Sequence, residues 1–387
     1  MKILFTGGGT GGHIYPIVSV AEVLLQTSSE PVDLYYVGVP GVYEQQLTSR
    51  GMTVFRVASA KLRSGELLRN LLDVPFFFIG LLQALWRVFL IMPDILFSKG
   101  GPGALPVVLA CAFYRIPIIV HESDSVAGFT NRVSGKYADA IGIAFATAKE
   151  SFIKEGMPEY KRAAIEHKLA LVGNPIRDIF FMPGDTAAKT DAKRLLDFDP
   201  AKPLIVVIGG SQGSVRVNDF FMSIAEELLN RNIQVLHQAG LNNAATTQAD
   251  LAGIMQKYSD TFRRAYRIVP YFGQEIKDAL LAADIVVSRA GSGAIFEIAA
   301  MGCPAILVPL PESARDHQVK NAFEYASTGA AITVEEANLT KHTFLTQVDK
   351  LLADSALLAS MASAAKAFAK PDAADVLVQE ILRLSKK

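Results

Sequence analysis

Residues 7–13 read GGGTGGH, and this stretch decides the fold. It follows the apolar run KILFT at residues 2–6 and precedes residues 14–25, where apolar side chains recur at helical spacing. The sequence therefore predicts a strand, a glycine turn and a helix, in that order. Glycine permits positive φ and a close approach of the backbone to a ligand. The start of a helix offers free N–H groups, which suit a phosphate or another oxyanion.

A second opening of the same kind lies in the second half of the chain. Residues 204–208 (LIVVI) are typical of a buried strand, GGSQGS follows at residues 209–214, and residues 217–229 have helical periodicity. A chain of 387 residues is long enough for two domains. We therefore predict an α/β fold of two Rossmann-like domains with parallel sheets facing across a cleft, and we expect the site in that cleft.

Composition excludes several classes of protein. The formal net charge is zero, so no global field attracts nucleic acid. Half of the residues are hydrophobic and the mean hydropathy is +0.27, which indicates a large core or a surface that meets lipid. Cys111 and Cys303 lie in apolar runs without a CxxC pattern, so we expect neither a disulfide nor a metal site. The first strand begins at once, without a secretory leader, and we expect a cytoplasmic protein.

The first glycine turn also satisfies the dinucleotide pattern GxGxxG through Gly7, Gly9 and Gly12. A nicotinamide dinucleotide fold needs an acidic residue at the end of the next strand, where it holds the ribose. The strand predicted at residues 32–37 ends instead in Val-Gly-Val at residues 37–39. Dinucleotide binding is therefore disfavoured.

Residues 74–92 are the most apolar part of the chain, interrupted by Gln83 and Arg87. Their length nearly permits a membrane-spanning helix, but Pro75, Gly80 and Arg87 favour a helix packed in the domain, part of which touches lipid. Residues 56–92 carry five basic and two acidic side chains, a net of +3: Arg56, Lys61, Arg63, Arg69 and Arg87 against Glu66 and Asp73. We expect exposed aromatic residues here, such as Phe77 and Trp86. Residues 182–191 look like a loop and a plausible hinge.

Polar side chains gather where first-half strands end. His121, Glu122, Ser123 and Asp124 follow a predicted strand, at the sheet edge where α/β proteins bind ligands. His13 lies beside the first glycine turn and can accept a proton near neutral pH. A solvated turn for the first group, and a capping or core role for His13, are the alternatives.

The second half has the parts of a nucleoside diphosphate site. The turn at residues 209–214 and the small-residue helix start at residues 291–294 each suit a phosphate. Glu297 could accept two hydrogen bonds from a ribose diol; a solvated helix face is its alternative. No GK[ST] sequence follows a glycine loop, so a diphosphate fits better than a triphosphate.

Six motifs in this order resemble the MurG family of bacterial glycosyltransferases over nearly the whole chain: GGGTGGH (7–13), HES (121–123), GNPIR (173–177), GGSQGS (209–214), RAGSGAIFE (289–297) and DHQ (316–318). The family moves N-acetylglucosamine from UDP to lipid I (undecaprenyl-diphospho-N-acetylmuramoyl-pentapeptide), which yields lipid II for peptidoglycan. The resemblance implies the GT-B fold, inverting transfer, and no cofactor or bound metal. It further implies a peripheral enzyme on the cytoplasmic face of the cell membrane, with UDP-N-acetylglucosamine, lipid I and that membrane surface as partners.

The resemblance also implies the roles of domains and residues. Residues 1–176, completed by a helix at 371–387, form the acceptor and membrane-facing domain, and residues 177–370 form the UDP-sugar domain. His13 is implied as the catalytic base or as an acceptor-binding group, and Glu122 is the next candidate for the base. The implied donor-binding residues are Thr10, Gly11, Gly12, Asp124, Arg177, Ser211, Phe272 (through its backbone), Ser292, Gly293, Ala294, Ile295, Phe296, Glu297 and Gln318.

The sequence departs from the family pattern at three places. Asp124 stands where the family has asparagine, Pro102 where it has an aromatic residue, and His317 where it has the first of two glutamines. These departures keep other hypotheses open: transfer to another lipid, such as diacylglycerol or a sterol, or a catalytically inactive UDP-sugar-binding regulator. A UDP-sugar 2-epimerase shares the two-domain fold but not this set of motifs.

Overall fold

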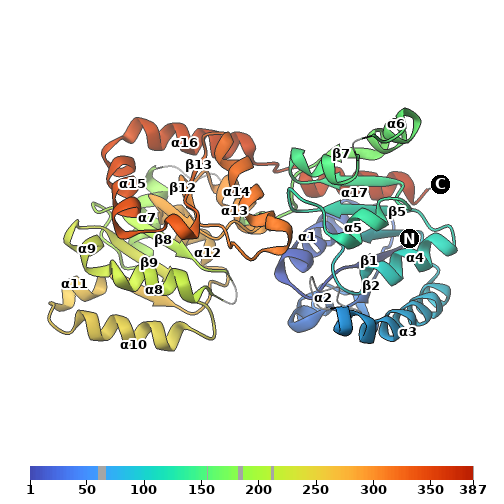
Figure 1. The fold of residues 1–387 in the computed structure, drawn as a ribbon, viewed down its shortest axis with the longest axis horizontal. Coiled ribbons are helices and arrows are strands. Elements are labelled where there is room, and N and C mark those ends of the chain that lie inside the picture. The colour runs from blue at the N-terminus through green and yellow to red at the C-terminus, as the bar shows by residue number, and fades with distance from the viewer. Residues whose placement is uncertain (60–66, 155, 182–185, 211–212, 387) are drawn as a thin grey trace. The chain divides into compact units, whose positions relative to one another are not determined.

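The computed structural model describes residues 1–59, 67–154, 156–181, 186–210 and 213–386. The chain divides into two compact units, Met1–Arg177 with Lys370–Lys387, and Asp178–Ala369. Each unit has its own sheet, and neighbouring strands in both sheets run parallel (Figure 1). The predicted α/β fold with two parallel sheets is confirmed.

The first unit has the strand order β3-β2-β1-β4-β5-β6-β7, which contains the order of a Rossmann fold. Its strands are β1 (Lys2–Thr6), β2 (Asp33–Gly38), β3 (Thr53–Arg56), β4 (Ile95–Ser98), β5 (Ile118–Glu122), β6 (Ala140–Ile143) and β7 (Leu169–Leu171). Its helices are α1 (Gly11–Thr27), α2 (Glu44–Thr48), α3 (Leu67–Ile91), α4 (Ala104–Phe113), α5 (Phe129–Ser134), α6 (Glu159–Lys168) and α17 (Ala373–Leu384). Strand order reverses between β1 and β4, and such switch points bind ligands.

Both faces of this sheet are buried, because side chains alternate along each strand. Ile3 and Phe5 of β1 belong to a core that includes residues of α1 and α17. Leu4 belongs to a second core that includes residues of α3 and α4. Pro371 separates two helices, because α16 (Ser355–Phe368) ends before it and α17 begins after it. Helix α17 packs against α1 and so completes the first unit.

The second unit repeats the pattern, with the strand order β10-β9-β8-β11-β12-β13. Its strands are β8 (Leu204–Ile208), β9 (Gln234–Gln238), β10 (Tyr266–Val269), β11 (Ile285–Ser288), β12 (Ala305–Leu307) and β13 (Ala331–Thr333). Its other helices are α7 (Thr186–Leu195), α8 (Val215–Ser223), α9 (Ala225–Asn230), α10 (Ala244–Met255), α11 (Asp260–Arg264), α12 (Ile276–Ala282), α13 (Ser292–Met301), α14 (His317–Ser327) and α15 (Lys341–Ala353). The order reverses between β8 and β11, which places the expected ligand crevice there.

The loop predicted at residues 182–191 is wrong over its second half. Helix α7 begins at Thr186, and residues 182–185 lie outside the described part of the chain. The Nζ atoms of Lys189 and Lys193 each lie 2.7 Å from a carboxylate oxygen of Asp284. These ion pairs join α7 to the start of β11, and such long-range contacts are invisible in local sequence.

Helix α3 packs on the domain through one face. Gly80 is required there, because a Cβ at this position would lie 2.2 Å from the carbonyl oxygen of Ala58. The two polar residues in the apolar run also face the domain: Gln83 accepts a hydrogen bond from the Ala58 N–H at 2.8 Å, and the Arg87 guanidinium lies 4.5 Å from the centre of the Phe55 ring.

The opposite face of α3 is exposed and apolar. Among the described residues, Asp73–Ile91 is one unbroken helical stretch long and apolar enough to cross a membrane, and 22% of it is buried. Length and composition alone support that possibility, whereas the contacts of Gly80, Gln83 and Arg87 show a helix that is part of the domain. The predicted packed helix is therefore confirmed.

A buried histidine lies in the second sheet. His237 of β9 donates from Nε2 to the side-chain oxygen of Asn218 at 3.1 Å, and its Nδ1 accepts from the Tyr266 hydroxyl at 2.9 Å. The Asn218 amide is oriented by its own bond to the carbonyl of Ala239. Burial lowers the pKa of His237 to about 3. His237 is therefore neutral in the folded protein at every pH above about 4.

We expect this histidine to make folding sensitive to mild acid. Below pH 6.5 the unfolded chain protonates His237 and the folded chain does not, so stability falls as pH drops from 6.5 toward 3. Between pH 6.5 and 5 the loss is about 2 kcal/mol. Urea unfolding at pH 7.5, 6.5, 5.5 and 5 measures it. The His237→Gln variant can keep both hydrogen bonds without titrating and should lose less stability. An equal loss in parent and variant would contradict this origin.

Candidate functional site

The second unit contains a pocket of about 400 Å³ at the switch point between β8 and β11. Its walls are the glycine turn after β8, the start of α8, the turn between β11 and α13, and the side chains of Leu310 and Gln318. Gly213 has a φ of +75°, and a Cβ there would lie 1.9 Å from the carbonyl oxygen of Ala239. Only glycine fits at this position, so the backbone geometry explains why the predicted loop is rich in glycine.

Two helix starts meet this pocket. Ser214 caps α8 by accepting a hydrogen bond from the Val217 N–H, whereas Gly291 provides no side-chain cap for α13. The first-turn N–H groups of α13 are therefore not satisfied by a capping side chain. A helix N-terminus of this kind carries a partial positive charge and binds oxyanions.

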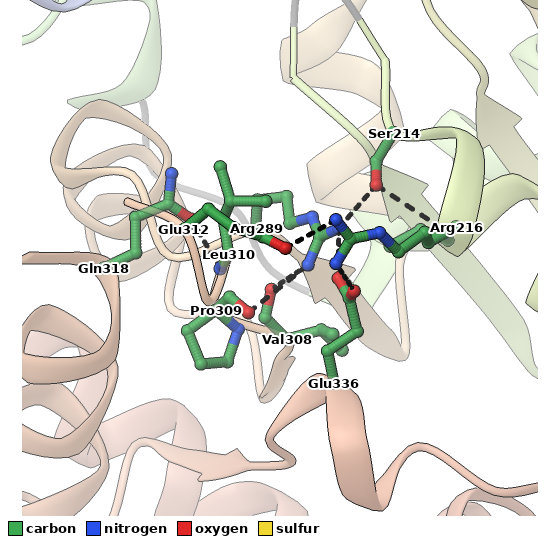
Figure 2. Close-up of polar contacts among 10 residues, drawn as sticks. Ser214, Arg216, Arg289, Val308, Pro309, Leu310, Glu312, Gln318 and Glu336 are labelled. Atoms are coloured by element: carbon green, nitrogen blue, oxygen red, sulfur yellow. Dashed lines mark hydrogen bonds and ion pairs between the residues drawn. The ribbon is translucent and has the colours of Figure 1, made fainter. Parts of the chain in front are cut away.

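Arg289 lines the pocket, and several polar partners hold its guanidinium (Figure 2). Its guanidinium donates to the Ser214 hydroxyl at 2.6 Å and to the carbonyl oxygens of Val308 and Pro309 at 3.2 and 3.3 Å. It also lies 2.5 Å from a carboxylate oxygen of Glu336. The motif at residues 289–297 begins with Arg289. The sequence alone assigns this arginine no role, because its partners come from distant loops.

Gln238, at the end of β9, links the glycine turn after β8 to Phe272. Its amide donates to the carbonyl of Gly210 at 2.7 Å, and its side-chain oxygen accepts from the backbone N–H of Phe272 at 3.2 Å. The Phe272 side chain is buried, so this residue offers its backbone rather than its ring. Because the N–H is already bonded, its carbonyl is the group left for a base. The sequence missed Gln238, since nothing local marks it.

Helix α13 divides the predicted residues 292–297 into two sets. Ser292, Ile295 and Phe296 are buried, and the Phe296 ring packs 5.1 Å from that of Phe368. Gly293, Ala294 and Glu297 are partly exposed, and Ala294 lines the pocket. Ile295 and Phe296 thus hold the helix in place through their side chains.

Gln318 also lines the pocket, but Ser211 cannot be placed. The Gln318 side-chain oxygen accepts from the Leu310 N–H at 3.1 Å (Figure 2), so its amide NH₂ group is the end that remains for a ligand. Ser211 lies outside the described residues.

In the first unit, His13 lies against two glycine turns. A Cβ on Gly101 would lie 2.9 Å from the His13 Nε2, and one on Gly8 would lie 3.2 Å from Nδ1. Thr10 holds the ring through a 2.7 Å hydrogen bond between its hydroxyl and Nδ1. Burial, and then the charge of Lys99, lower the pKa of His13 to about 4. His13 is therefore neutral at physiological pH, as a proton acceptor must be.

Thr10, Gly11 and Gly12 form the start of α1, next to His13. Thr10 and Gly12 are exposed, and a Cβ on Gly12 would meet no atom within 4 Å. Gly11 lies against the rings of Tyr15 and Tyr43, 3.2 Å from where its Cβ would be. Arg177 lies near this group, with its guanidinium 5.2 Å from the centre of the Tyr15 ring. The structure thus brings four of the predicted donor-binding residues together in the first unit.

Lys99 is a buried cation that the sequence analysis did not single out. It follows β4, is 2% exposed, and places Nζ 2.6 Å from the Nδ1 of His121 and in contact with the Ser123 hydroxyl. His121 donates from Nε2 to the carbonyl of Gly173 at 2.8 Å, so its Nδ1 is the acceptor. Burial lowers the pKa of Lys99 to about 7, although the carboxylates of Glu122 and Asp124 oppose the shift.

Glu122 is bonded through both carboxylate oxygens. One accepts from the Asp124 N–H at 3.0 Å, and the other from the Gly128 N–H at 3.1 Å and the Asn131 amide at 2.9 Å. Burial and the neighbouring Asp124 raise its pKa. These bonds suit a residue that positions the loop after β5 better than one that meets substrate. Asp124 is partly exposed, within the electrostatic reach of Lys99.

Within the described ranges, no group of three or more His, Cys, Asp or Glu side chains could hold a metal ion. Cys111 and Cys303 are buried free thiols. Burial raises the pKa of both, which makes them poor nucleophiles.

Two α/β units with glycine turns at their switch points are the architecture of the GT-B fold, and comparison with known proteins gives the class of enzyme. The Glycosyltransferase family 28 N-terminal domain matches residues 3–143, and the Glycosyltransferase family 28 C-terminal domain matches residues 204–377. The chain therefore belongs to glycosyltransferase family 28.

Curated relatives of the chain include enzymes that share one name. The chain is 35% identical over 356 residues, 91% of each chain, to the UDP-N-acetylglucosamine–N-acetylmuramyl-(pentapeptide) pyrophosphoryl-undecaprenol N-acetylglucosamine transferase of Lachnospira eligens. It is 32% identical to the enzyme of that name from Halalkalibacterium halodurans, over 99% of this chain and 100% of the relative. The predicted MurG-family membership is confirmed.

Solved structures show the same fold. The crystal structure of Acinetobacter baumannii MurG superposes with a TM-score of 0.74 at 24% identity and covers 99% of both chains. A UDP-GlcNAc 2-epimerase from Neisseria meningitidis superposes with a TM-score of 0.68 at 12% identity, over 99% of this chain and 100% of the other. At these identities the likeness concerns the fold alone.

Proposed function

We propose that this protein transfers N-acetylglucosamine from UDP-N-acetylglucosamine to lipid I, which yields lipid II for peptidoglycan synthesis, cell shape and cell division. The observation that carries the proposal is near-full-length similarity, at 30–35% identity, to relatives named for this reaction. The pocket at the two helix starts of the second unit supports it, because it suits a diphosphate.

The two units divide the chemistry in this proposal. The second unit binds UDP, with the Phe272 carbonyl at the uracil, Glu297 at the ribose and the helix starts at the diphosphate. The first unit binds the acceptor, and His13 takes the proton from its attacking hydroxyl. The developing charge on the leaving diphosphate is stabilised by N–H groups that are already oriented, which is the larger part of such catalysis.

Asp124 and Lys99 support a functional first unit despite the departures from the family pattern. The family resemblance places the donor diphosphate near this aspartate, and Lys99, which is partly protonated at neutral pH because its pKa is about 7, offsets part of the negative charge. The loop that carries Asp124 is held by both oxygens of Glu122. This arrangement favours an active enzyme over an inactive regulator.

One assay tests the proposal against its alternatives. The purified protein is incubated with UDP-N-acetylglucosamine and a short-chain lipid I analogue, and the products are separated by mass spectrometry. Lipid II is the expected product. Transfer to diacylglycerol or a sterol instead, formation of UDP with the free 2-epimer, or donor binding without turnover would each replace the proposal with one of the alternatives.

We further propose that the protein docks on the cytoplasmic membrane surface through the apolar face of α3. This face consists of Phe76, Phe78, Ile79, Leu82, Trp86, Phe89 and Leu90, all of them exposed. Burial of apolar area in the interface contributes about 25 cal/mol per Å², and each basic group near an anionic surface contributes about 1 kcal/mol. Lys61 and Arg63, two of the expected basic groups, lie outside the described residues. Because the net charge of residues 56–92 is only +3, the apolar contribution is expected to dominate.

Binding to anionic liposomes should survive salt but not the loss of two apolar side chains. Phe77, expected to be exposed, is half-buried; the better pair is Leu82 and Trp86, which are 67% and 59% exposed. Flotation in about 0.5 M salt, where the Debye length is a few Å, should retain the parent and release the Leu82→Ser/Trp86→Ser variant. Leu195→Ser, an equally exposed apolar residue of the second unit, is the control. Complete release of the parent by salt would mean that electrostatics dominates.

A further inference from the structure

Two arginines, Arg216 and Arg289, line the pocket of the second unit, and they differ in how exposed their side chains are. Arg289 is 10% exposed and has a hydroxyl, two carbonyls and a carboxylate as partners. It cannot turn toward a ligand without abandoning these groups in a buried place, which is costly. Arg289 is therefore part of the frame of the pocket.

Arg216, the second of these arginines, is the more exposed one. It lies in the first turn of α8, and its side chain is 56% exposed. Figure 2 shows its guanidinium bound by two carboxylates, those of Glu312, at 2.7 Å, and Glu336. Glu336 is also paired with Arg289, so it keeps a partner if Arg216 leaves. Glu312 is as exposed as Arg216, so water can solvate its carboxylate.

A diphosphate in the pocket offers Arg216 a better partner than Glu312. An exposed ion pair contributes little to stability, because water solvates both ions almost as well. A diphosphate accepts two parallel hydrogen bonds from a guanidinium and in total carries more negative charge than a single carboxylate. The helix starts of α8 and α13 hold such a group close to Arg216, since Ser214, Gly291 and Arg216 line the same pocket.

We propose that Arg216 is a diphosphate-binding residue, which passes from Glu312 to the phosphate groups of the donor when the nucleotide enters. The inference rests on the proposed function, because it takes this pocket to bind a nucleoside diphosphate sugar. Glu312 then competes with the donor phosphates for the Arg216 guanidinium. It binds Arg216 when no nucleotide is present, and this ion pair must break when the donor binds. Binding of the donor also breaks the ion pair that connects α8 to the loop at residues 310–316, which contains Glu312. This loop lies next to Gln318 at the start of α14.

The test compares UDP with uridine, which lacks the phosphates, by calorimetry in low salt. Arg216→Gln should weaken UDP binding about tenfold and leave uridine binding unchanged. Glu312→Gln should tighten UDP binding a few-fold, and this gain should vanish in the Arg216→Gln background. Arg231→Gln is the control, since it removes the same charge from an exposed pair with Asp349 in the same unit, outside the pocket lining.

Three results would overturn the inference. They are UDP binding by Arg216→Gln within twofold of the parent, an equal loss of uridine binding, and no gain from Glu312→Gln. The proposed function fails differently, because in that case the parent protein itself binds no UDP or transfers no sugar. A parent that binds UDP with no dependence on Arg216 therefore refutes this inference alone.

Discussion

Replacement of His13 with alanine should lower kcat about 10²–10⁴-fold, the contribution of a positioned general base. The ring is held by the Thr10 hydroxyl and fits between Gly8 and Gly101, so its position is defined before substrate binds. The pKa of about 4 keeps it neutral, and the acid limb of the pH–rate profile should lie near 4 rather than at the ordinary 6.5.

The measurements are steady-state kinetics and calorimetry on the same preparations. UDP binding should be unchanged in His13→Ala, because the nucleotide pocket belongs to the second unit. His13→Gln keeps a polar side chain of similar reach but cannot act as a base, so it should lose as much kcat as alanine. If both variants keep kcat within a few-fold of the parent, another group is the base and Glu122→Gln is the next variant to measure.

Replacement of Glu297 with alanine should raise the KM for the donor about 10- to 150-fold. This range corresponds to about 1.5–3 kcal/mol, the contribution of hydrogen bonds to a charged group. Glu297 is partly exposed, one turn beyond the pocket-lining Ala294 on α13. Because Ile295 and Phe296 anchor the helix through their buried side chains, loss of the carboxylate should spare the fold.

Calorimetry with UDP and 2′-deoxy-UDP isolates the ribose contact. The parent should bind the deoxy ligand more weakly than UDP, and Glu297→Ala should distinguish the two much less. Asp349→Asn is the matched control, because it removes an exposed carboxylate of the same unit that pairs with Arg231. Unchanged UDP affinity in Glu297→Ala would remove this residue from the site.

Local sequence predicted the parts of this protein that local physics determines. The two strand–glycine–helix openings are visible because strand and helix periodicities and glycine requirements act over a few residues. Gly213 illustrates this, since its positive φ and the nearby Ala239 carbonyl leave no room for a side chain. Both openings lie at the sheet switch points, and family 28 domains match both halves of the chain.

The residues that the sequence missed act through distant partners. Arg289 pairs with Glu336, Gln238 bonds to Gly210, and Lys99 bonds to His121. Each pair becomes visible only when strands far apart in the chain end at the same edge of a sheet. The same limit explains why the start of α7 was predicted as a loop. Lys189 and Lys193 of this helix pair with Asp284, which lies far away in the sequence.

Helix α17 has a consequence for synthesis on the ribosome. Leu377, Val378 and Ile381 complete the core that contains Ile3 and Phe5, yet they are translated only after the whole second unit. At the usual 5–20 residues per second, the nascent first unit waits roughly ten to forty seconds with an apolar surface uncovered. The second unit can thus finish folding before the first, although its sequence comes later. A nascent chain stalled before residue 370 should consequently recruit chaperones through its earliest-made part.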